Sequence, residues 1–186
     1  PYGRLFHTGD WKLDAKPILG DPASAEELTA IGANGGEGTL ALIGDSTNVF
    51  NAEPSGSESG VFDGLMKLVK SRKRGRVVVT TFASNATRVH TLGEVAKATG
   101  RKLVVAGRSL DRIIAVAKAT GYLKDFPEPI SLEAAANARP ESLLIVVTGT
   151  QGEPQAALAK IAEGTHPYIR LERGDLVVYS SKQIPG

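Results

Sequence analysis

The sequence contains no cysteine, and this absence excludes disulfide bridges, thiolate zinc sites and a cysteine nucleophile. Histidine is scarce as well, because His7, His90 and His166 stand singly and none is paired with another at the spacing of metal ligands. The chain by itself therefore cannot assemble a multi-histidine metal centre. No apolar run approaches the roughly 20 residues that span a bilayer, and no signal peptide is visible. We expect a soluble, cytoplasmic protein with no membrane partner.

A strong excess of one charge is also missing. Lysine and arginine total 22 and aspartate and glutamate total 20, so the overall charge gives no long-range attraction to nucleic acid or membranes. Any binding of phosphate has to be local. Neither GxGxxG nor GxxxxGK[ST] occurs, which disfavours a dinucleotide site and a P-loop. The basic stretch SRKRGR, residues 71–76, falls at a predicted helix end, where cations offset the helix dipole, and we interpret it as a solvated surface.

What the chain does have is a regular alternation of apolar patterns beyond residue 75. Four apolar runs rich in β-branched residues predict buried strands at residues 76–82, 102–107, 143–149 and 175–181. Helical spacing of apolar residues predicts helices at 85–99, 110–120 and 154–163, and Ser109 is placed to cap the second. This alternation predicts an α/β fold with a doubly wound, mostly parallel sheet.

The beginning of the chain has a different organisation. Residues 39–45 form another apolar run, residues 60–73 have helical periodicity, and a polar loop joins the two. We predict that residues 1–48 belong to a second sheet and that residues 49–186 form the α/β domain. The chain starts at Pro1 without methionine, and we expect it to be a segment of a longer protein.

Polar turns follow the predicted strands of the α/β domain. In an open parallel sheet, ligands bind outside the carboxyl ends of the strands, where helix N-termini present backbone N–H groups. Four such turns carry hydroxyls, small residues or a cation, which favours a surface for a phosphate chain. Taken one at a time, Ser84, Ser109 and Thr150 are better explained as helix caps. The candidate phosphate-binding residues are Ser84, Asn85, Arg88, Arg108, Ser109, Thr150, Gln151, Gly152 and Glu153.

A carboxylate, Asp10, follows a short apolar strand near the N-terminus, in the stretch HTGDWKLD. Strand ends are common places for a metal ligand, but a lone aspartate is more often a turn former. The residues alone leave both interpretations open.

The order and spacing of six motifs resemble ribonuclease J. The motifs are HTGDWKLD (7–14), GDSTN (44–48), TTFASN (80–85), AGRS (106–109), TGTQGEPQAAL (148–158) and SSKQIPG (180–186). Along almost its whole length the chain resembles the β-CASP region of that family, within the metallo-β-lactamase superfamily. The stretches TGTQGEP, GRS and SS…IPG favour ribonuclease J over the DNA-directed β-CASP nucleases.

The resemblance implies roles for particular residues. Asp10 corresponds to the carboxylate that bridges two metal ions in the superfamily, so it is the predicted metal ligand and a catalytic residue. Asp45 resembles the catalytic acid of the first β-CASP motif, and His7 matches a neighbour that is not usually a ligand. The turns at 82–85, 107–109 and 148–153 would line an RNA channel, and residues 1–48 would be the end of a metallo-β-lactamase domain.

For the full-length protein, the resemblance implies a ribonuclease that uses two zinc ions to hydrolyse single-stranded RNA, as a 5′-to-3′ exonuclease, an endonuclease or both. We expect that protein to be a homo-oligomer. The histidine motifs that define the family's metal site are absent from this chain. The segment alone is therefore expected to bind no zinc pair and to hydrolyse no RNA. Two alternatives remain open: a non-catalytic α/β module for a nucleotide or phosphate, and a DNA-directed β-CASP nuclease.

Overall fold

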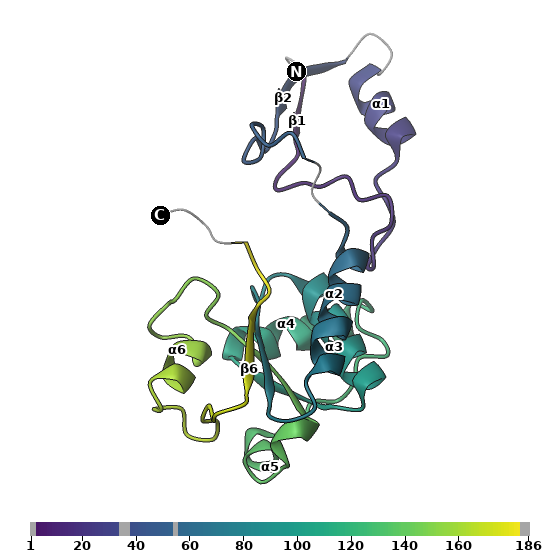
Figure 1. Ribbon diagram of the computed structural model, residues 1–186. Helices are drawn as coiled ribbons and strands as arrows, with labels where there is room; N and C mark the ends of the chain where they lie inside the picture. Colours follow the sequence, from purple (N-terminus) through teal and green to yellow (C-terminus); the bar gives the residue numbers. More distant parts are fainter. Residues whose placement is uncertain (1–2, 34–37, 54–55, 183–186) are drawn as a thin grey trace. The chain divides into compact units, whose positions relative to one another are not determined.

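The computed structural model describes residues 3–33, 38–53 and 56–182, and it divides the chain into two compact units, Pro1–Ser59 and Gly60–Gly186 (Figure 1). The last four residues of the motif SSKQIPG lie outside the described residues. None of the described helices is both long enough and apolar enough to cross a membrane.

The first unit contains two parallel strands, β1 (Arg4–His7) and β2 (Thr39–Ile43), and one helix, α1 (Ala25–Ala33). The strand at β2 was predicted, but α1 was not. Its start is fixed locally, because the hydroxyl of Ser24 accepts a hydrogen bond from the amide of Glu27 at 3.1 Å. The assignment of this unit to a metallo-β-lactamase domain remains a prediction.

The second unit is built on four parallel strands. They are β3 (Val77–Thr80), β4 (Lys102–Ala106), β5 (Leu143–Val147) and β6 (Leu176–Tyr179), in the spatial order β4-β5-β3-β6. All of β3 and β5 is buried, because both are covered on two faces and flanked by other strands. The predicted parallel α/β fold is confirmed.

Helices cover both faces of this sheet. On one face, α2 (Glu58–Ser71), α3 (Ala86–Thr99) and α4 (Arg108–Ala119) pack against the side chains of Val77 and Val79. On the other, α5 (Leu132–Ala136) and α6 (Ala157–Ala162) pack against Val78 and its neighbours, since successive strand residues point to opposite faces. Figure 1 shows α2, α3 and α4 on one side of β6 and α6 on the other. A single 3₁₀ turn, η2 (Pro140–Ser142), leads into β5.

The connections between strands create a crevice at one edge of the sheet. The chain leaves β5 toward α6 on one face, whereas it leaves both neighbours of β5 toward helices on the opposite face. Adjacent parallel strands whose connections diverge in this way leave an opening outside their carboxyl ends, where ligands bind in open α/β sheets.

Candidate functional site at the carboxyl edge of the sheet

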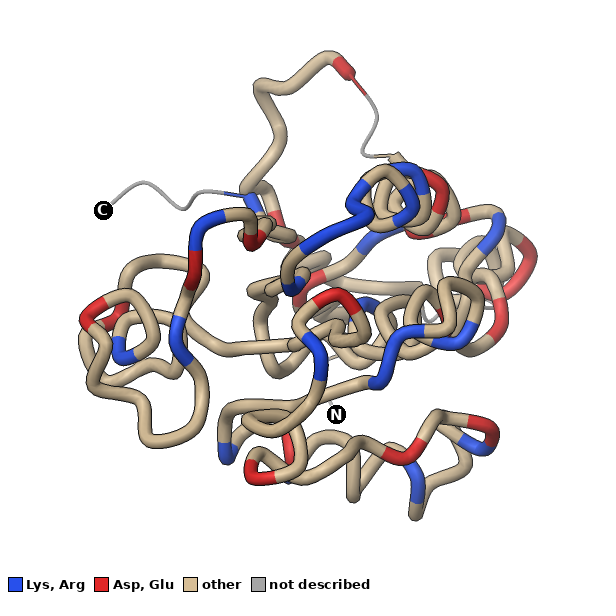
Figure 2. The backbone as a smooth tube through the Cα atoms, turned by 60° about the horizontal axis from the view of Figure 1, so that its bottom comes forward, with Lys and Arg blue, Asp and Glu red and all other residues tan. Residues whose placement is uncertain are grey.

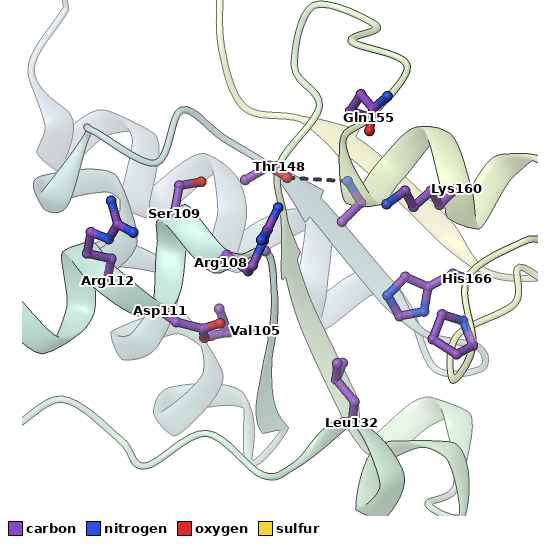
Figure 3. Close-up of a pocket in the computed structure, with 13 residues that line it drawn as sticks. Val105, Arg108, Ser109, Asp111, Arg112, Leu132, Thr148, Gln155, Lys160 and His166 are labelled. Carbon is purple, nitrogen blue, oxygen red and sulfur yellow. Dashed lines mark hydrogen bonds between the residues drawn. The ribbon is translucent and has the colours of Figure 1, made fainter.

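A cleft of about 670 Å³ lies at this crevice, between the start of α4 and the start of α6 (Figure 3). The helix α4 contributes Arg108, Ser109, Asp111 and Arg112, and the β5–α6 segment contributes Thr148, Gln155 and Lys160. His166, which follows α6, and Leu132 of α5 complete the wall that the figure labels. Its size is within the range of small-molecule sites in proteins.

Gly107 allows the ends of β4 and β5 to approach closely. A Cβ atom built on Gly107 would lie 2.9 Å from Cγ2 of Thr148, a distance that side chains do not tolerate. On the other side of the same threonine, Oγ1 accepts a hydrogen bond from the amide of Ala157 at 3.3 Å. Thr148 thus satisfies the first turn of α6 and positions that helix beside the cleft.

The predicted helix caps are wrong. α4 begins at Arg108, so Ser109 lies inside the helix, and no side chain caps its first turn. The amides of that turn therefore remain available to a ligand. Asn85, not Ser84, caps α3 by accepting from the amide of Arg88 at 2.9 Å. Thr150 caps nothing either, because α6 starts at Ala157 and not at residue 154.

Positive charge predominates in the cleft. Arg108, Arg112 and Lys160 line it together with one carboxylate, Asp111. Within the part of the chain that the structure describes, none of these three cationic side chains has an ion-pair or hydrogen-bond partner. Partial burial raises the pKa of Asp111 above its ordinary value, which weakens the opposing negative charge at low pH. Elsewhere on the chain, basic and acidic residues are interspersed (Figure 2).

His166 was not predicted to take part in this site. Its side chain is only 8% exposed, and its Nδ1 atom accepts hydrogen bonds from the amides of Ile169 at 3.1 Å and Tyr168 at 3.3 Å. Burial, followed by the nearby charge of Lys160, lowers the pKa of His166. The sequence carried no signal for this role, since a lone histidine has no pattern. Arg108 and Arg112, in contrast, are four residues apart and share a helix face.

The TGTQGEP turn lies beside the cleft and contacts the end of β6. The side-chain amide of Gln151 donates to the carbonyl of Lys182 at 3.1 Å, and the carboxylate of Glu153 accepts from the amide of Gln151 at 3.0 Å. Thr150 is buried, and Gly152 has a φ of +78°, which favours glycine. None of these four residues lines the cleft, so the predicted surface has two separate parts.

Arg88 belongs to the second part of this edge. Its Nη1 atom donates to the backbone carbonyl and to the hydroxyl of Ser180, both at 2.7 Å. The guanidinium therefore ties the start of α3 to the residue after β6. Ser84 is exposed in the same turn, and the role of both residues in phosphate binding remains a prediction.

The two predicted catalytic carboxylates come together in the first unit. Asp10 and Asp45 line one shallow hollow of about 370 Å³, because they follow the parallel neighbours β1 and β2 at the same edge. The amide of Asp45 donates to the hydroxyl of Thr8 at 3.2 Å. Hydrogen bonds from the hydroxyl and then the amide of Thr47 lower the pKa of Asp45, so this carboxylate is held ionised.

This hollow does not by itself fit a zinc ion. Among the described residues, no group of three or more histidine, aspartate or glutamate side chains lies close enough to hold a metal. His7 is the histidine nearest in sequence, and its Nδ1 atom accepts a hydrogen bond from the amide of Gly9 at 2.9 Å. A stable zinc site takes four ligands or three with water, so Asp10 offers one ligand of an incomplete set.

Comparison with known proteins agrees with the motifs and the fold. The family model described as ribonuclease J, beta-CASP domain, matches residues 74–186. Ribonuclease J 1 of Streptococcus pyogenes is 40% identical over 190 residues, which cover 100% of this chain and 32% of that protein. The ribonuclease J of Corynebacterium glutamicum is 40% identical over 188 residues, covering 100% of this chain and 26% of that protein. For the ribonuclease J of Thermus thermophilus the identity is 37% over 186 residues, with 100% and 32% covered.

The parallel α/β unit is thus a β-CASP domain, the class that its fold and sequence match define. The chain belongs to the ribonuclease J family, as the motifs predicted. It spans about a third of the length of the curated relatives it matches, such as those of S. pyogenes and T. thermophilus.

Proposed function

We propose that this chain is a segment of a ribonuclease J-like nuclease that hydrolyses phosphodiester bonds of single-stranded RNA, and that the carboxyl edge of its β-CASP sheet binds the RNA backbone. The observation that carries this proposal is the cleft with three cations and no neutralising partner among the described residues, found in a chain of the ribonuclease J family. Fixed cations beside free helix amides bind phosphate oxygens without reading the base. Such binding suits an enzyme that moves along RNA.

Arg108 is the residue best placed for this contact. It opens α4 at the carboxyl end of β4 and lines the cleft, and its planar guanidinium is able to meet two phosphate oxygens at once. Arg88 is the weaker candidate because Ser180 already occupies part of its hydrogen-bonding capacity. The turn from Thr148 to Glu153 forms a wall beside the same edge.

The metal chemistry of the full-length protein is also part of the proposal. Zinc, if bound there, would activate a water molecule for attack on the phosphodiester and offset charge on the phosphoryl oxygens. Asp10 would supply one ligand, and Asp45, held ionised by Thr47, would accept a hydrogen bond from a group next to it. The described residues do not complete a metal site, so the remaining ligands would have to come from other parts of the full-length protein. Homo-oligomerisation and a cytoplasmic location remain predictions.

Binding of a short single-stranded RNA at two salt concentrations tests the proposed RNA surface. We expect Arg108→Ala to weaken binding by about 1–3 kcal/mol for different sequences alike and to reduce the salt dependence by about one phosphate contact. Arg139→Ala is the matched control, because Arg139 is 84% exposed and lies just before the amino end of β5. An Arg108 variant that is folded and binds with the original affinity and salt dependence would exclude Arg108 from the surface.

A further inference from the structure

We propose that the cleft between α4 and α6 is a subsite for one nucleotide phosphate, in which the Nε2–H group of His166 donates a hydrogen bond to a phosphate oxygen facing the first turn of α4. The phosphate chemistry is argued from the cleft alone. Only the suggestion that RNA delivers the phosphate rests on the function proposed above.

The hydrogen bonds of His166 fix which ring nitrogen carries the proton. Because Nδ1 accepts from the amides of Tyr168 and Ile169, it cannot hold a proton, and the neutral ring must carry its hydrogen on Nε2. This Nε2–H group has no hydrogen-bond partner among the residues that the structure describes. Figure 3 shows the ring directed into the cleft, toward the side on which Arg108 lies.

A polar group in this situation indicates a missing ligand. The side chain of His166 is more than nine-tenths buried, and buried donors in folded proteins almost always have an acceptor. A hydrogen-bond acceptor that occupies the cleft would satisfy it. The backbone bonds to Nδ1 leave the ring little freedom to turn toward any other partner.

The charges around the cleft select an anionic acceptor. Arg108 and Arg112 lie on α4 and Lys160 lies on α6, so cations flank the position that Nε2 of His166 faces. The first turn of α4, a helix of 12 residues without a side-chain cap, adds free amides and the positive end of the helix dipole. Asp111 is the one carboxylate of the described lining, and three cations outweigh it.

The size of the cleft fits more than an isolated phosphate ion. A volume of about 670 Å³ leaves room for a sugar and a base beside the phosphate, and Leu132 and Pro167 offer apolar surface to them. Two sources could supply such a group: a free mononucleotide, or a nucleotide within an RNA chain. Both present the same phosphate oxygens to the cleft.

Two substitutions separate the binding role of His166 from its structural role. In His166→Asn, the side-chain oxygen takes the place of Nδ1 and still accepts from the amides of Tyr168 and Ile169, but the Nε2–H donor is lost. In His166→Gln, the side-chain NH₂ reaches the place of Nε2 and restores the donor, while the acceptor for the backbone is lost. A purely structural histidine is therefore replaced better by asparagine, and a phosphate donor better by glutamine.

The test is a titration of the 186-residue chain with uridine 5′-monophosphate, followed by NMR of the histidine side-chain nitrogens and by calorimetry. We expect saturable binding that shifts the Nε2 signal of His166, and at least about ten-fold weaker binding of uridine, which lacks the phosphate. His166→Asn should weaken nucleotide binding about ten-fold, and His166→Gln should retain most of it. Unchanged binding by a folded His166→Asn variant, or equal binding of uridine, would overturn the proposal.

A second arm identifies the source of the phosphate and keeps the two proposals apart. An RNA oligonucleotide that competes with uridine 5′-monophosphate and shifts the same His166 signal assigns the subsite to the RNA path. Binding of the mononucleotide without competition assigns it to free nucleotides, and the subsite stands although the RNA surface fails. RNA binding that depends on Arg108 but leaves the His166 signal unmoved would sink the subsite and leave the proposed function intact.

Discussion

The carboxylate of Asp175 holds Arg76 at two points. Its Oδ1 atom accepts from the backbone amide of Arg76 at 2.7 Å, and its Oδ2 atom lies 3.1 Å from the Nη1 atom of the guanidinium. The side chains are only 3% and 12% exposed, so water screens the pair little. Because Arg76 directly precedes β3 and Asp175 directly precedes β6, this pair fixes the edge strand to the centre of the sheet.

Removing the buried carboxylate should therefore destabilise the second unit. We expect Asp175→Ala to lower the free energy of unfolding by about 3 kcal/mol, since it leaves the guanidinium and amide of Arg76 without their main partner. Urea denaturation followed by circular dichroism measures the loss. Glu172→Ala is the control, because that carboxylate is 61% exposed and its bond to Arg76 should contribute less than about 1 kcal/mol. Equal losses in the two variants would contradict the argument.

Gly93 lies where α3 meets the loop that follows α4, and it tolerates no side chain. A Cβ atom there would lie 2.5 Å from Cε2 of Phe126 and 3.0 Å from Cδ of Pro127. Gly93→Ala should cost about 1–3 kcal/mol through overpacking, although alanine is the better helix former. Gly64→Ala in α2 is the matched control, because its Cβ meets nothing within 4 Å, and it should stabilise by up to about 1 kcal/mol. Thermal unfolding that ranks the two variants in the opposite order would refute this packing argument.

The lowered pKa of His166 predicts a pH dependence of stability. Burial, with the charge of Lys160, disfavours the protonated ring in the folded state. The unfolded chain therefore binds more protons at this site once the pH falls below about 6.5, the ordinary pKa of histidine. The stabilisation is complete above that pH and declines as the pH falls toward the folded pKa.

Unfolding free energies at pH 7.5 and pH 5.5 check this expectation. The chain should lose more stability over this interval than His166→Asn, whose side chain does not titrate. Arg108 and Asp111 also line the cleft, so a parallel measurement on Asp111→Asn accounts for the second titrating group. If the wild-type chain and His166→Asn respond to pH identically, the histidine is not the source of the effect.

The proposed role of Asp10 is tested in the full-length nuclease. If Asp10 holds metal, Asp10→Asn removes a negative charge from the site, and RNA hydrolysis should fall by more than about 100-fold while the fold persists. Asp21→Asn, another exposed aspartate of the first unit, should leave turnover unchanged. Zinc content measured beside turnover shows whether metal is lost with activity. Normal turnover with normal metal content in the Asp10 variant would exclude the role.

The sequence predicted the sheet well because burial on both faces leaves a direct trace in composition. The runs around Val78, Val104 and Ile145 are continuous and apolar, and the structure buries all three side chains completely. Helix starts were predicted less well, since they depend on backbone geometry. Ser109 has a capping side chain, but the chain enters α4 at Gly107, which must approach Thr148 closely.

The site could be predicted only in part. Arg108 was found because it follows a strand end, where parallel sheets place their ligands. His166 and Lys160 reach the cleft from the far side of α6, and only the way that helix packs on the sheet brings them to Arg108. No local pattern encodes such a meeting of distant residues.

The strand order has a consequence for how the chain becomes folded. Val77 of β3, the earliest strand of this sheet, pairs with Leu144 and Leu176, and makes no pair with the strand that follows it in sequence. During synthesis β3 and β4 are therefore both made before β5 joins them, and their apolar edges stay open in the meantime. Such non-local pairing slows folding and prolongs exposure of sticky strands. The ribosome and chaperones, rather than the finished fold, must protect Val77–Thr80 until the middle of the sheet is made.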